Sequence, residues 1–110
     1  MAPATEAKQG GAGAGSEDEG HILLPAALDF AAAEGLRDEL VALRDLPVVV
    51  LDASAVTGMS TAAVLVILGF LNARTEFSPP AVVRDPAGPF VDAFSQLGLF
   101  ADLMRMEFRT

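Results

Sequence analysis

The chain has 110 residues, a formal net charge of −8 and no cysteine. This length limits it to one domain, and the missing cysteines exclude disulfides, thiolate metal sites and cysteine nucleophiles. The acidic balance has the wrong sign for nucleic acid or an anionic membrane surface, because both require clustered basic side chains. The longest apolar run, residues 62–71, is far shorter than the roughly 20 residues that span a bilayer. We therefore expect a cytoplasmic protein whose partner is another protein.

Residues 1–20 are predicted to be a disordered tail. They are rich in glycine and alanine, contain the acidic run Glu17-Asp18-Glu19 and have no large apolar residue after Met1. Such a segment buries too little apolar surface to offset the entropy lost on ordering. It also lacks the basic start and apolar stretch of a signal peptide. The folded domain is therefore expected to cover residues 21–110.

A one-sided helix is predicted to follow an opening strand around Ile22. Asp29 can cap this helix, which should end near Leu43. Its apolar residues recur at helical spacing along one face, namely Phe30, Ala33, Leu36, Leu40 and Leu43.

A buried central strand is predicted after Pro47. The run Val48-Val49-Val50-Leu51 is apolar without alternation, which is typical of a strand covered on both faces in a parallel sheet. A polar turn containing Gly58 follows. The next helix should run from Thr61 to about Arg74, and because it is apolar nearly all round, we expect it to be well covered.

The hydroxyls of Ser60 and Thr61 lie at the predicted start of this helix. Unpaired backbone N–H groups and the helix dipole favour a negative charge there. Either hydroxyl can serve as an ordinary helix cap, and a phosphate on Thr61 would be stabilised at the same place.

The last third of the chain predicts a strand, a helix and a final strand. The strand is expected at residues 81–84, and the helix begins at Gly88-Pro89, buries Phe90, Ala93, Phe94 and Leu97, and ends at Gly98. Alternation from Met104 to Arg109 predicts a half-exposed strand at a sheet edge. The sum is a single small α/β domain, β-α-β-α-β-α-β, with a mostly parallel sheet and crossover helices.

Three segments, in this order, resemble the STAS domain of bacterial anti-sigma factor antagonists. Residues 21–29 resemble the family's opening strand and turn, and residues 94–100 the end of its third helix. Residues 51–64 resemble the segment in which a valine-threonine turn leads to aspartate, a phosphoacceptor serine, a small residue, glycine and leucine. Here those five places are held by Ser60, Thr61, Ala62, Ala63 and Val64.

The resemblance implies a STAS-like fold and a regulatory protein without enzymatic activity or cofactor. It further implies partner switching in transcription regulation, in which the unphosphorylated form binds an anti-sigma factor with serine-kinase activity and frees a sigma factor. Phosphorylation would end the binding, with Thr61 as the phosphoacceptor and Ser60 as the second choice. The docking surface implied by the family motif comprises Gly58, Met59, Ser60, Thr61, Ala62 and Val64.

No side-chain pattern in the sequence is typical of a catalytic or metal site. His21 is the only histidine, and neither a glycine-rich phosphate loop nor a serine-histidine-aspartate order is present. Asp52 ends the central strand, where open α/β sheets often place ligand-binding groups. We expect it instead to stabilise the following turn by accepting N–H groups.

Departures from the family pattern leave other functions open, since Ser60 replaces its aspartate and Ala63 its glycine. One alternative is a regulatory subunit of a membrane transporter, as in lipid-transport ABC systems. Others are a chemotaxis or signalling adaptor without phosphorylation, and a small domain that binds an anion at the Thr61 helix start. The family usually has a further helix after the last strand, and its absence here predicts an open sheet edge and a weak homodimer.

Overall fold

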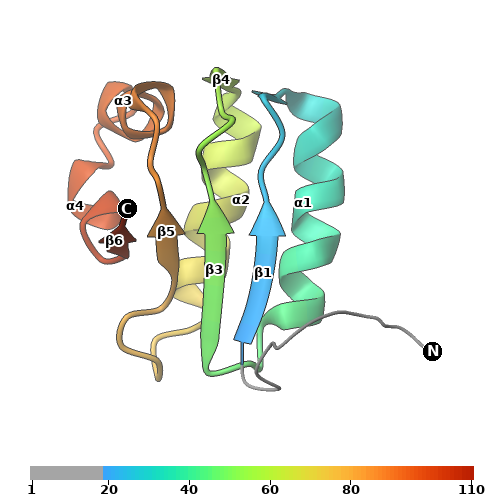
Figure 1. The fold of residues 1–110 in the computed structure, drawn as a ribbon, viewed down its shortest axis with the longest axis vertical. Helices are drawn as coiled ribbons and strands as arrows, with labels where there is room; N and C mark the ends of the chain where they lie inside the picture. The colour runs from blue at the N-terminus through green and yellow to red at the C-terminus, as the bar shows by residue number, and fades with distance from the viewer. Residues whose placement is uncertain (1–18) are drawn as a thin grey trace.

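The computed structural model describes residues 19–110, which form a parallel sheet with helices packed on it (Figure 1). The strand order is β1 (Glu19–Leu23), β3 (Val48–Asp52), β5 (Val82–Arg84) and β6 (Glu107–Arg109). The connections contain α1 (Phe30–Leu43), α2 (Thr61–Asn72), α3 (Gly88–Gln96) and α4 (Phe100–Leu103). All pairings in this sheet are parallel and its order follows the chain, so right-handed crossovers place the connections on one face. The predicted α/β fold is confirmed.

Strand β1 begins two residues earlier than expected. Glu19 pairs with Val48 and Gly20 with Val49, so both belong to the sheet rather than to the tail. A Cβ atom on Gly20 would lie 2.8 Å from a methyl carbon of Leu43 and 3.0 Å from one of Leu46. A side chain at this position would therefore displace the methyl groups of Leu43 and Leu46, and glycine lets β1 lie this close to them. The rest of the predicted tail, residues 1–18, lies outside the described residues.

Helix α1 begins as predicted, with Asp29 Oδ1 accepting a hydrogen bond of 2.8 Å from the Ala32 N–H. Ala33, Leu36 and Leu40 are buried against the core, as the apolar spacing indicates. Phe30, however, is 69% exposed, so the prediction that it belongs to the buried stripe is wrong. Phe30 is the first residue of α1, and its side chain lies outside the core.

Helix α2 is covered on one side only, which corrects the prediction that it is well covered. Its buried face includes Val64, Ile67 and Leu71, but Leu65 is 53% exposed and Gly69 is also exposed. The reason is that α1 and α2 pack side by side and no third helix lies over their joint outer surface in residues 19–110. Within the same residues, no helix has the length and apolar character to cross a bilayer.

The C-terminal third departs from the prediction in one element and in one side chain, since Leu97 is 41% exposed and not buried. Helix α3 ends as expected, with Gly98 in the left-handed region at φ +73°, and Phe90 packs on Phe94 at 5.4 Å between ring centroids. The predicted long strand from Met104 is wrong, because α4 and a turn precede β6. Amide hydrogen bonds of 3.0 Å from Leu103 to Leu99 and from Met104 to Phe100 form that helical turn. Local helix formation therefore outweighs the alternating pattern there.

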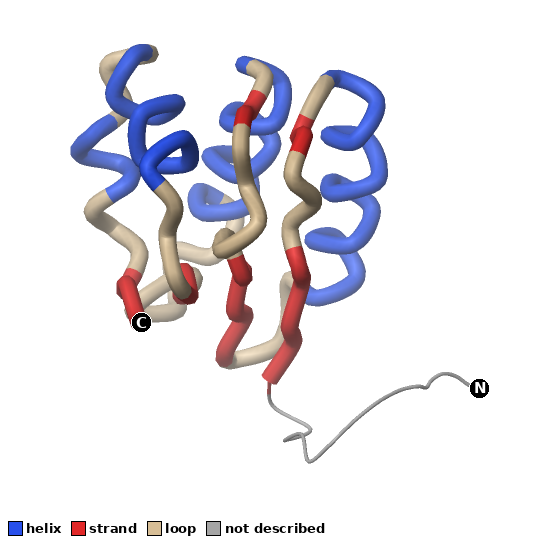
Figure 2. The backbone as a smooth tube through the Cα atoms, turned by 45° about the horizontal axis from the view of Figure 1, so that its top comes forward, coloured by secondary structure: helices blue, strands red, loops and turns tan. Residues whose placement is uncertain are grey.

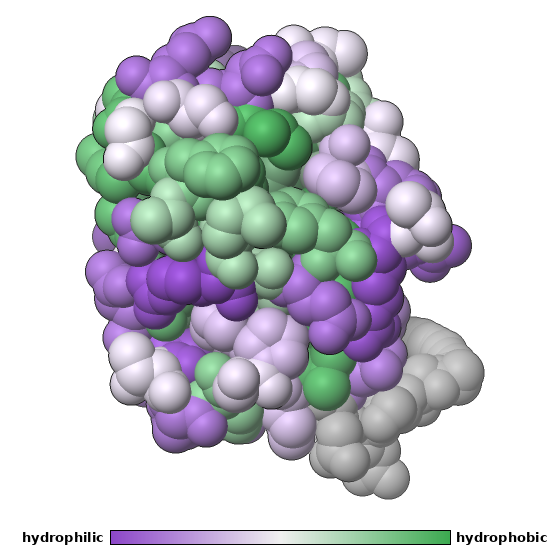
Figure 3. Space-filling view, turned by 90° about the vertical axis from the view of Figure 1, so that its left-hand side faces the viewer, coloured by the Kyte–Doolittle hydropathy of each residue, from purple (hydrophilic) through white to green (hydrophobic). Residues whose placement is uncertain are grey.

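Strand β6 lies at the edge of the sheet, and no further strand pairs with it among the residues described. Figure 3, which faces this edge, shows apolar side chains gathered in a band. The exposed large apolar residues of this region are Leu97, Phe100 and Met104. The open edge thus agrees with the sequence-based expectation, and a homodimer formed through it stays a prediction.

A fully buried arginine joins several elements at the opposite end from the helix starts. Arg74 follows α2, and its guanidinium donates to the carbonyl oxygens of Pro80 at 2.6 Å, Arg44 at 2.5 Å and Pro47 at 3.4 Å. The same group lies over the ring of Phe77 at 4.2 Å and near that of Phe70 at 5.1 Å. It therefore links the end of α1 to the chain leading into β3 and β5.

Burial lowers the pKa of Arg74 from its ordinary value, because removal from water disfavours the charged form. The charges of Glu76 and Asp45 act in the opposite direction. An arginine side chain stays protonated in proteins even so, and its planar fork can serve several carbonyl groups at once. The three carbonyl partners replace the hydrogen bonds that water would otherwise supply.

We predict that Arg74→Ala lowers the free energy of unfolding by about 3 kcal/mol, because it leaves buried carbonyl groups unpaired and opens a cavity. Urea unfolding followed by circular dichroism measures the change. Arg44→Ala is the matched control and should stay within about 0.5 kcal/mol of the wild type, since the Arg44 side chain is exposed and only its carbonyl is used. Equal stability of the two variants would contradict the role given to Arg74.

Candidate functional site

A small second ladder lies beyond the carboxyl end of the main sheet, next to the starts of α1 and α2 (Figure 2). It pairs β2 (Ala27–Leu28) with β4 (Gly58–Met59) in parallel. The Ala26 carbonyl accepts hydrogen bonds from the N–H of Thr57 at 2.8 Å and from its Oγ1 at 3.0 Å. The Ser60 N–H donates to the Leu28 carbonyl at 2.8 Å. These bonds fix the loop that leads from β3 into α2.

The structure assigns different positions to the two hydroxyls at the start of α2. Ser60 is the cap, because its Oγ accepts the Ala63 N–H at 3.1 Å and its carbonyl accepts the Val64 N–H at 3.2 Å. Thr61 is the first helical residue and is exposed. Within residues 19–110 its hydroxyl takes part in no hydrogen bond. The N–H groups of Thr61 and Ala62 also lack an acceptor in that part of the chain.

All residues of the predicted docking surface but one are at least partly accessible to solvent. Gly58, Met59, Ser60 and Ala62 are half-buried beside the exposed Thr61. Val64 is wrongly assigned to this surface, since it has no exposed area and packs in the core with Ala63 and Ile67. The family motif gives the order of residues along the chain but not the side of the helix on which each one lies.

Phe30 adds an exposed aromatic side chain to this end of the molecule. The sequence pattern predicts instead that this side chain is buried in the core. A hollow of about 360 Å³ between the starts of α1 and α2 is lined by Phe30 and Ala62, among others. Exposed aromatic side chains are frequent anchors in protein interfaces. The only sequence signal for its exposure is its position directly after the Asp29 cap, before the first full turn of α1.

Asp52 stabilises the turn after β3, as predicted. Its Oδ1 accepts the Ser54 N–H at 3.0 Å and the Ser54 hydroxyl at 2.7 Å. These two hydrogen bonds, and to a smaller degree the charge of Arg84, lower the pKa of Asp52 from its ordinary value, against a small opposing effect of desolvation. The Asp52 carboxylate therefore serves as a hydrogen-bond acceptor within its own loop.

No metal site is formed by the described part of the chain. Residues 19–110 contain no group of three or more histidine, aspartate or glutamate side chains placed to hold an ion. His21 Nε2 lies 2.9 Å from Glu19 Oε1 on the exposed surface of β1.

We predict that Asp52→Ala destabilises the fold by about 1 kcal/mol near neutral pH. Because the pKa of Asp52 is lower in the folded than in the unfolded state, its contribution is complete above the unfolded value of about 4. The contribution is lost as the pH falls through the lower, folded-state value. Urea unfolding of both proteins between about pH 2 and 7 should show the difference shrinking only at the acidic end. A difference independent of pH would mean that the charge of Asp52 has no role in the turn.

Comparison with known proteins agrees with this geometry. The family model of the STAS domain matches residues 16–104. A solved structure of a candidate anti-sigma factor antagonist from Thermotoga maritima has a TM-score of 0.66 and 15% sequence identity, covering 86% of this chain and 82% of that one. At this identity the likeness concerns the fold alone, and no curated protein is matched. Since the family model covers most of the sequence, the chain belongs to the STAS domain family.

Proposed function

We propose that this domain is a non-enzymatic, protein-binding regulator of the anti-sigma factor antagonist type, acting in the cytoplasm. The observation on which the proposal rests is that Ser60 caps α2 whereas Thr61 does not. Ser60 satisfies the start of α2, which leaves the Thr61 hydroxyl exposed and free of hydrogen bonds within the described residues. A kinase can therefore reach Thr61 without unfolding the helix.

A phosphate on Thr61 would be locally stable. The N–H groups of Thr61 and Ala62 and the positive end of the α2 dipole are available to it. The modification adds roughly −1.5 to −2 charges at neutral pH. It would thus change the electrostatics of the surface while the helix itself keeps its position.

The same phosphate would oppose docking. The surface around it includes Gly58, Met59 and Ala62, with the exposed Phe30 on the neighbouring helix start, and the carboxylates of Glu34 and Asp38 line the adjoining hollow. A partner that covers this area would have to remove water from a doubly charged group. We propose that the unphosphorylated form binds an anti-sigma factor with serine-kinase activity, and that phosphorylation of Thr61 by this partner ends the binding.

We predict that Thr61→Glu weakens binding of the partner by at least about tenfold, whereas Thr61→Val binds as the wild type does. A glutamate at the first helical position should leave the melting temperature equal or slightly raised, because it suits the helix dipole. Loss of binding would then not reflect unfolding. The measurement is co-purification from native extract, followed by titration of the recovered partner and mass spectrometry of the bound protein.

The matched control is Thr75→Glu, which adds the same charge at an exposed threonine after the far end of α2. It should bind normally. Phosphate that is still incorporated into Thr61→Val would refute Thr61 as the acceptor. Recovery of a transporter ATPase whose binding is insensitive to Thr61→Glu would refute partner switching and favour a transporter subunit.

A further inference from the structure

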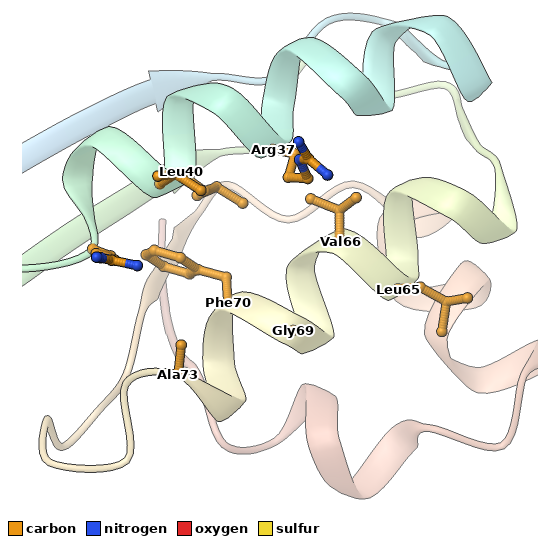
Figure 4. Close-up of a pocket in the computed structure, with 9 residues that line it drawn as sticks. Arg37, Leu40, Leu65, Val66, Gly69, Phe70 and Ala73 are labelled. Atoms are coloured by element: carbon orange, nitrogen blue, oxygen red, sulfur yellow. The ribbon is translucent and has the colours of Figure 1, made fainter.

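A groove that the proposed function does not use runs between α1 and α2 on their solvent-facing side (Figure 4). Its volume is about 380 Å³. The walls are apolar and include Leu40 and Val41 of α1 and Leu65, Val66 and Gly69 of α2. Two cationic side chains, Arg37 and Arg44, stand on the α1 side. These residues together form what is called here the helix groove.

The two arginines of the helix groove are the exposed arginines that have no carboxylate partner within the described residues. Six arginines are present there. Three of them form ion pairs with nearby carboxylates, and Arg74 is buried against backbone carbonyl groups. Arg37 and Arg44 are exposed and, like the buried Arg74, have no carboxylate oxygen within 4.0 Å among residues 19–110. In an acidic protein, two uncompensated cations on one groove favour an anionic occupant.

Gly69 provides room that the chain itself does not fill. Glycine in the interior of a helix destabilises it relative to alanine. Apart from its chain neighbours and the adjoining backbone of α2, no atom lies within 4 Å of the place where a Gly69 Cβ would be. Ala73, one turn later, is also small and exposed. The backbone of another element can therefore approach α2 closely at this point.

Acidic and basic side chains are distributed unevenly along the groove. The hollow next to the starts of α1 and α2 shares Arg37 and Val66 with the helix groove and is also lined by Glu34 and Asp38. The depression is therefore elongated, acidic toward the helix starts and basic toward the helix ends. Arg37 and Arg44 are seven residues apart, which corresponds to about 10.5 Å along a helix.

We propose that the helix groove docks an acidic amphipathic helix of a partner protein. Apolar side chains at i, i+3, i+4 and i+7 would fill the groove, and two carboxylates seven residues apart would pair with Arg37 and Arg44. An anionic amphiphile with one head group carries charge at one end only and fits two separated cations less well. The chain's own residues 1–18 have no large apolar residue after Met1 to fill the groove.

The probe is an 18-residue helical peptide, acetylated and amidated, with a leucine stripe and two glutamates seven residues apart. The control peptide has lysine at those two positions. Fluorescence anisotropy and amide NMR shifts report binding. We expect the glutamate peptide to bind at least about tenfold more tightly than the lysine peptide, with shifts centred on Arg37, Val41, Arg44, Gly69 and Ala73.

Two variants test the groove itself. Arg37→Glu combined with Arg44→Glu should reverse the preference, so that the lysine peptide binds more tightly. Gly69→Leu fills the groove and should abolish binding, whereas Gly35→Leu, also at an exposed helical glycine with open space, should not change it. Equal binding of both peptides, no binding of either, or shifts in the groove with decanoate alone would overturn the proposal.

Discussion

The hydrogen bonds from Thr57 and Ser60 to the carbonyl groups of Ala26 and Leu28 determine where α2 begins. They hold the β3–α2 loop beside the loop that follows β1, although the two are about thirty residues apart in the sequence. Because the backbone of Ser60 is fixed in this way, its side chain is committed to the cap. The next side chain, Thr61, consequently faces solvent. The geometry of the proposed switch follows from this backbone pairing.

Helix α2 connects the parts of the molecule to which the two proposals assign a role. Its start carries the proposed phosphoacceptor, its outer side forms one wall of the helix groove, and its inner side fills the core through Val64, Ile67 and Leu71. Just beyond its end, Arg74 ties it to the beginnings of β3 and β5. A helix fixed at both ends and along one side can present two surfaces to partners without changing shape itself.

Features that depend on local chemistry could be predicted from the sequence. The Asp29 cap, the β-branched run of β3 and the left-handed Gly98 each follow from a few neighbouring residues. The order of these elements, together with the motif around Ser60 and Thr61, was sufficient for the family. The role of Asp52 was also predictable, because an aspartate at the end of a strand commonly bonds to the turn that follows.

Features that depend on tertiary packing could not be predicted in this way. The exposure of Phe30 and Leu65 depends on where neighbouring helices stop, and periodicity alone does not contain that information. The same is true of Val64, which the motif placed on the surface and the fold places in the core. Burial of Arg74 requires carbonyl groups from two other stretches of chain, Arg44 and Pro47 after α1 and Pro80 before β5, and the residue pattern around Arg74 does not indicate them.

The assignment of the cap to Ser60 and of the free hydroxyl to Thr61 is the central claim. Amide hydrogen exchange of Ala63, measured by NMR in the wild type, Ser60→Ala and Thr61→Ala, tests it most directly. Protection of the Ala63 N–H should be lost in Ser60→Ala and retained in Thr61→Ala, because only Ser60 Oγ accepts that group. Loss of protection in Thr61→Ala instead would show that Thr61 is the cap and is not free for modification.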